Sequence, residues 1–113
     1  MTYRDDRARL EDIMHAIEDI ERYQKRGRTE CQQDELIRTW LTYQIQIIGE
    51  AASKVSEQLR AEHPEVPWRQ IVAMRHILVH DYFDTDFGEV WNVVTTDLPG
   101  LKKNVTRIIH PER

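Results

Sequence analysis

Apolar side chains recur at spacings of three and four residues over most of the chain, which is the pattern of helices that bury one face. Charged residues fill the positions between the members of the first stripe, which are Leu10, Ile13, Met14, Ile17 and Ile20. Thr2 with Asp5 is expected to cap the start of this helix, and the basic run ending at Gly27 is expected to close it. The pattern predicts an amphipathic helix with a solvated, acidic back.

A second, longer helix is expected from a capping pair, Thr29 with Gln32, to about Arg60. It carries two neighbouring apolar stripes, one with Ile37, Leu41, Ile48, Ala52, Val55 and Leu59, the other with Leu36, Trp40, Tyr43, Ile47 and Ala51. Two stripes predict burial on two sides, against the protein's own core and against a second copy of the chain. The small residues at 49–52 would let a neighbouring backbone approach closely.

The segment 63–68 interrupts the pattern, and Pro67 suits the first position of a third helix, expected to carry Ile71 to Val79. Asp86 and its neighbours are expected to cap a fourth helix, and Asp97 a fifth with Pro99 in its first turn. No segment shows the alternation of apolar and polar residues that is typical of a β-strand. The prediction is an all-α, antiparallel bundle of four to five helices, forming one domain over residues 1–113.

Composition agrees with a soluble helical domain, since 40% of the residues are hydrophobic and 32% are charged. No apolar run approaches the roughly 20 residues of a membrane span, and the N-terminal residues form no apolar signal core. With one cysteine, no internal disulfide is available, so we expect a cytoplasmic protein. The net charge of -4 argues against coating nucleic acid by bulk electrostatics, but not against an enzyme that visits RNA.

The third predicted helix carries the candidate chemistry. It is apolar almost all round, which is typical of a buried helix, yet it includes Arg75, His76, His80 and Tyr82. A cation buried without a partner is costly, so these groups require a cleft, a counter-charge or a function. A purely structural interpretation stays open, in which Arg75 pairs with an acidic residue such as Glu50 and the histidines lie at the surface.

Arg75, His80 and Tyr82 form the pattern R-x4-H-x-Y, and in this respect the chain resembles the HepT-like HEPN ribonuclease toxins. The resemblance extends to the segments 47–52, 63–68, 74–83 and 90–99, so it covers nearly the whole chain. One departure is His76, because the residue after the arginine is commonly an amide, usually Asn, in such proteins. The role of this position is therefore open.

The resemblance implies a metal-independent endoribonuclease without a cofactor, in which the RNA's own 2′-hydroxyl attacks the adjacent phosphate. Arg75 would clamp the phosphate, His80 would act as general acid or base, and His76 would be an auxiliary proton-transfer group. On a straight helix Arg75 and His80 point about 140° apart, so we expect either a helix that ends or bends near His80, or a site shared by a homodimer.

The same resemblance implies a toxin silenced by a partner, an MntA-like nucleotidyltransferase antitoxin that adds AMP to Tyr82. The expected partners are RNA, this antitoxin and a second copy of the chain, with no membrane and no DNA. One alternative is a catalytically silent HEPN module that scaffolds or regulates a nucleotidyltransferase. Another is a metal site on His76, His80 and Asp84, which lacks both the H-E-x-x-H glutamate and an evident further ligand. The last alternative is a helical bundle whose polar groups form internal ion pairs and have only a structural role.

Overall fold

The computed structural model describes the backbone of residues 3–76 and 87–112, with side chains from residue 5 onward. These residues form α1 (Tyr3–Gln24), α2 (Arg28–Gln33), α3 (Glu35–Ser53), α4 (Glu57–Glu62), α5 (Trp68–Ala73), α6 (Phe87–Asn92), a π-helical segment η1 (Val93–Asp97) and α7 (Leu98–Ile109). The described residues include no strand, so the all-α prediction is confirmed. None of the described helices is both long enough and apolar enough to cross a membrane.

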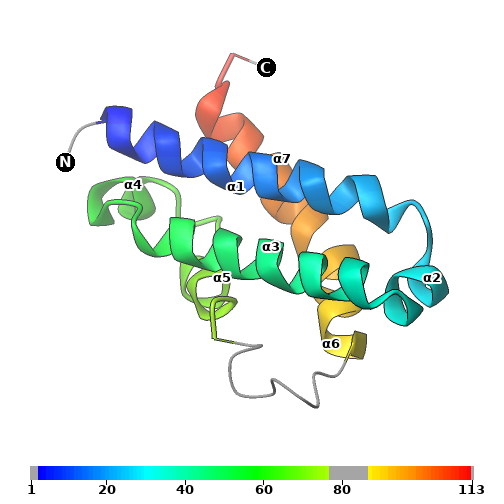
Figure 1. Ribbon diagram of the computed structural model, residues 1–113. Helices are drawn as coiled ribbons and strands as arrows, with labels where there is room; N and C mark the ends of the chain where they lie inside the picture. The colour runs from blue at the N-terminus through cyan, green and yellow to red at the C-terminus, as the bar shows by residue number, and fades with distance from the viewer. Residues whose placement is uncertain (1–2, 77–86, 113) are drawn as a thin grey trace.

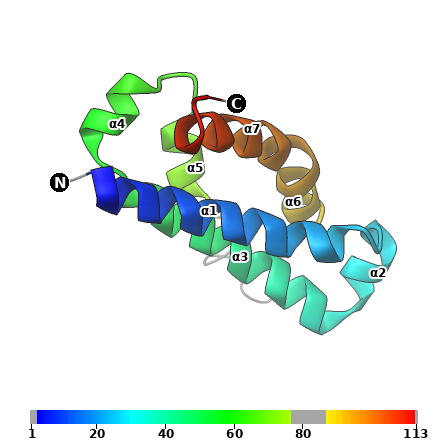
Figure 2. The ribbon, with the colours of Figure 1, turned by 90° about the horizontal axis from the view of Figure 1, so that it is seen from above.

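The core lies where α1 packs against α3 and α7. Helices α1 and α3 run antiparallel and side by side, and α7 packs on the other side of α1 (Figures 1 and 2). The predicted stripe on α1 is buried as expected, and its fully buried members include Ile13, Ile17 and Ile20. They belong to one core with Ile48 of α3 and Val105 of α7. Each such side chain stabilises the fold by about 1.5–3 kcal/mol.

The single long helix expected from Thr29 to Arg60 is wrong, because the chain breaks it into α2, α3 and α4. Asp34 caps α3 by accepting hydrogen bonds from the backbone N–H groups of Leu36 (2.9 Å) and Ile37 (3.2 Å). Side chains of this kind offer the backbone an alternative to helical hydrogen bonds, so they end one helix and begin the next. The Thr29 capping pair is also wrong, since Gly27 precedes α2 and no side chain caps it.

Ser56 caps α4 and also joins it to the start of the chain. Its hydroxyl accepts from the N–H of Leu59 at 3.2 Å. Its own backbone N–H and hydroxyl donate to the two carboxylate oxygens of Asp6, at 2.9 and 2.6 Å. Asp6 is only 4% exposed, and these two hydrogen bonds satisfy its carboxylate inside the fold. The first turn of α1 is thereby fixed to the start of α4.

The third predicted helix is shorter than expected. Its α-helical part is α5, which ends at Ala73, and the N–H groups of Met74, Arg75 and His76 bond to carbonyls three residues earlier, at 2.9–3.2 Å. Such bonds tighten the last turn of a helix. A straight helix through Arg75 is therefore wrong, because α5 ends before this residue. Residues 77–79, His80 and Tyr82 lie outside the described residues.

Residues 87–109 form one continuous helix from α6 through η1 to α7, whereas the sequence predicts a new helix capped by Asp97. Asp86, the predicted cap of the preceding helix, lies outside the described residues. Asp97 makes no capping hydrogen bond through its side chain. The N–H of Leu98 instead donates to the carbonyl of Val93, five residues earlier. Pro99 explains this widened turn, because it has no N–H and its ring clashes with the carbonyl four residues before it.

Candidate functional site

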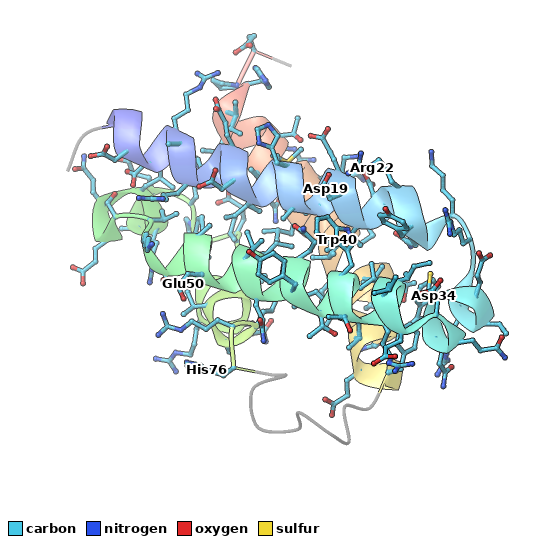
Figure 3. All side chains as sticks on the ribbon, in the orientation of Figure 1. Asp19, Arg22, Asp34, Trp40, Glu50 and His76 are labelled. Atoms are coloured by element: carbon cyan, nitrogen blue, oxygen red, sulfur yellow. The ribbon has the colours of Figure 1, made fainter. Side chains whose placement is uncertain are left out.

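The centre of the candidate site is the guanidinium group of Arg75, just beyond the end of α5. Its Nε donates a hydrogen bond to Nε2 of the neighbouring His76 at 3.1 Å. Its Nη1 lies 3.9 Å from Oε2 of Glu50 on α3. Figure 3 shows Glu50 on the face of α3 near His76, where the described chain after α5 ends. The site therefore combines a cation, a carboxylate and an imidazole from two segments.

Gly49 allows α3 and the segment after α5 to approach this closely. A Cβ atom added to Gly49 would lie 3.0 Å from the Cβ and 3.1 Å from the Cα of Arg75, and closer still to its backbone nitrogen. No real side chain has room there, so the backbone of Arg75 rests directly against α3. This confirms, at Gly49, the prediction of a close backbone approach in the segment 49–52.

The guanidinium of Arg75 remains accessible to a ligand. Its side chain is 36% exposed and that of Glu50 is 55% exposed, so water screens their attraction. Ion pairs of this kind contribute about 0–1 kcal/mol, which an incoming phosphate can replace. Arginine suits phosphate because it stays charged and can donate two parallel N–H groups. The sequence predicts that Arg75 needs a cleft, a counter-charge or a function, and Glu50 supplies the counter-charge.

The hydrogen bond from Arg75 engages Nε2 of His76 as its acceptor. His76 is exposed, so the same nitrogen can reach a ligand once the guanidinium turns away. Sequence reasoning singled out both residues, whereas it considered Glu50 only as a structural partner for Arg75.

The other two predicted site residues, His80 and Tyr82, lie outside the described residues, as does Asp84 of the alternative metal site. Within residues 5–76 and 87–112, no three His, Cys, Asp or Glu side chains gather as metal ligands would. The contacts of Arg75 also include the pairing with Glu50 that a purely structural interpretation expects.

Comparisons with known proteins give one consistent result. A family model described as "Ribonuclease HepT-like" matches residues 13–108. A Methanocaldococcus jannaschii protein named as a candidate RNase is 35% identical over 106 residues, which cover 93% of this chain and 97% of that protein. A Thermococcus cleftensis protein named as a probable ribonuclease HepT is 38% identical over 97 residues, covering 82% and 86%. No solved structure gives a significant match.

Proposed function

This chain belongs to the HepT-like ribonuclease family, and on that premise we propose that it is a metal-independent endoribonuclease. In the proposed reaction the RNA's own 2′-hydroxyl attacks the adjacent phosphorus and the bond to the 5′-oxygen breaks. The products are a 2′,3′-cyclic phosphate and a free 5′-hydroxyl. One group must take the proton of the attacking hydroxyl and another must supply a proton to the leaving oxygen.

The observation that carries the proposal is the accessible guanidinium of Arg75, held at its backbone by Gly49 and at its side chain by Glu50 and His76. Arg75 would exchange the carboxylate for the scissile phosphate. This exchange would free Nε2 of His76, which is suited to accept the proton of the 2′-hydroxyl. His80 remains the main candidate for general acid or base, since its unperturbed pKa lies near ~6.5.

We also propose that the protein works as a homodimer whose interface includes the outer face of α3. Leu36 is 81% exposed and Tyr43 is 54% exposed, which is unusual for large apolar side chains that lie on one face. Trp40 and Ile47 continue this face, and Glu50 stands at its end, because all five positions fall within one stripe of the helix. A second copy packed on this stripe would bring its own Arg75 toward the Arg75 of the first copy.

The regulatory part of the proposal concerns Tyr82. A nucleotidyltransferase antitoxin would add AMP to its hydroxyl, which places a negative phosphate and a bulky nucleoside two residues from His80. The added phosphate would compete with RNA for the guanidinium of Arg75. Co-expression with such a partner should add the mass of one AMP to the chain and restore growth. Tyr82→Phe should remain toxic and unmodified, while Tyr23→Phe, on α1 and outside the proposed interface stripe, should still be silenced.

The decisive test compares the purified chain with Arg75→Ala and His80→Ala on cellular RNA in the presence of a chelator. Arg69→Ala and His15→Ala are the matched controls, since they remove exposed residues of the same types from α5 and α1. Cleavage to cyclic-phosphate ends by the parent and both controls, but not by the two site variants, supports the proposal. If the folded parent cleaves no RNA yet still binds a nucleotidyltransferase, the chain is the silent HEPN module instead.

The dimer is tested separately by sedimentation of the parent and of Leu36→Glu, with Leu36→Ala as a milder change. A charge placed in an interface stripe should give monomers, because its burial is unfavourable. Equal sedimentation of the parent and Leu36→Glu would exclude this face of α3 from the interface.

A further inference from the structure

A cavity of about 550 Å³ lies between α5 and the junction of η1 with α7, on residues to which the proposed function gives no role. Its floor rests on the buried side chains of Ile71, Met74 and Leu101, and its accessible apolar wall is formed by the exposed Pro67 and Ala73. The volume falls within the range of about 300–1,000 Å³ that is usual for small-molecule sites. The cavity therefore offers a pre-formed apolar surface to a ligand.

Polar side chains stand at the edge of this cavity with free hydrogen-bonding capacity. Gln70 comes from α5, Asp97 from η1 and Asn104 from α7. Within the described part of the chain, none of these three side chains makes a hydrogen bond to the protein. A π-helical turn such as the one that presents Asp97 is rare and is frequently found at functional sites. The lining thus joins an apolar wall to two amides and one carboxylate.

We propose that this cavity binds a single unstacked nucleobase of the RNA, and that it favours bases with an exocyclic amino group. A nucleobase has an apolar face, which fits the wall, and an edge of donors and acceptors, which fits the amides of Gln70 and Asn104. The carboxylate of Asp97 accepts from an amino group, as carboxylates do from cytosine, and repels phosphate.

The position of the cavity connects it with the site of Arg75, and here the inference rests on the proposed function. Met74 belongs to the cavity floor, and Arg75 is the next residue of the same turn. An RNA strand that crosses the end of α5 would place one phosphate at Arg75 and a neighbouring base in the cavity. The two subsites differ in charge as their ligands require. The guanidinium of Arg75 would bind the phosphate, and the carboxylate of Asp97 would accept a hydrogen bond from the base.

The test measures binding of four 2′-O-methyl RNA tetramers, made of A, C, G or U, which lack the attacking hydroxyl and cannot be cleaved by the proposed reaction. For the parent, we expect the best of the amino-bearing oligomers to bind about tenfold more tightly than the U oligomer. Asp97→Asn should remove most of this ratio, because an amide also donates to the carbonyl groups of uracil. Gln70→Ala should weaken the preferred oligomer most. Asp12→Asn removes the same charge from α1, away from the cavity, and should leave the ratio unchanged.

The decisive quantity is the ratio of affinities for the amino-bearing and the U oligomers. The absolute affinity is not decisive, because the loss of a negative charge in Asp97→Asn strengthens the binding of every RNA. Equal binding of all four oligomers by the parent, or a ratio that Asp97→Asn leaves intact, overturns the inference. A cleavage assay on ordinary RNA separates the two proposals. If the protein cleaves RNA but binds all four oligomers equally, the nuclease proposal stands and the base site is refuted. If it prefers one oligomer but cleaves no RNA, the base site stands and the nuclease proposal is refuted. Failure to bind any oligomer overturns the base site outright.

Discussion

Replacing Gly49 with alanine places a methyl group where α3 meets the backbone of Arg75. The new Cβ would lie 3.0 Å from one atom of Arg75, 3.1 Å from another, and closer to a third, which is its backbone nitrogen. Because the nearest atom is backbone, no side-chain rotation relieves the contact, and the whole turn after α5 must move. Overpacking of this kind costs roughly 1–3 kcal/mol. Alanine recovers about 1 kcal/mol of helix propensity, so we expect a net loss of about 0–2 kcal/mol.

Gly100→Ala is the matched control, since Gly100 also lies in a helix and a Cβ there meets nothing within 4 Å. It should stabilise the protein by up to about 1 kcal/mol. Chemical denaturation of both variants gives the two free energies of unfolding, and RNA cleavage reports whether Arg75 has moved. We expect Gly49→Ala to lose activity even at temperatures where it is fully folded. If Gly49→Ala is as stable as Gly100→Ala, the close approach of Arg75 to α3 is incorrect.

Three further predictions follow from other contacts. Asp6→Ala should lower the free energy of unfolding by about 1.5–3 kcal/mol, measured in urea, because it removes a buried carboxylate that accepts two hydrogen bonds from Ser56; an unchanged midpoint would contradict this. Burial, and then the charge of Glu30, raise the pKa of the Cys31 thiol, so less thiolate is present near neutral pH. Alkylation of the folded protein should therefore begin at a higher pH than that of a small thiol such as glutathione, and matching pH profiles would refute it. Glu50→Gln should strengthen RNA binding at low salt by up to about fivefold, since it removes the carboxylate that competes for the guanidinium; weaker binding would instead make Glu50 a positioning residue.

The sequence predicts the helical class and the core stripe of α1 well, because a 3.6-residue period survives wherever a helix buries one face. It does not reveal the breaks at Asp34 and Ser56, since neither has a neighbouring glycine or proline and both act through side-chain caps. The end of α5 at Ala73 was missed for a related reason, because the apolar pattern continues beyond it. The spacing of apolar residues along the chain does not indicate where tertiary packing ends a helix.

The candidate site, like the fold, can be predicted from the sequence only in part. Arg75 and His76 could be found from their order along the chain, because residues adjacent in sequence stay adjacent in space. The sequence indicates Glu50 only as one possible partner of Arg75, and no sequence pattern indicates the cavity beside Met74. Its edge joins Gln70 to Asn104, which lie on different helices, so no spacing within one element brings them together.

The link between Asp6 and Ser56 has a consequence for the order in which the protein is built. It spans 50 residues and, together with the antiparallel pairing of α1 and α3, completes a helical frame from the first part of the chain. Translation proceeds at about 5–20 residues per second, and nearby helices pair far faster than that. The frame can therefore form during synthesis, before Arg75 has left the ribosome. A nascent chain would gain its structural support first and the guanidinium of Arg75 only afterwards.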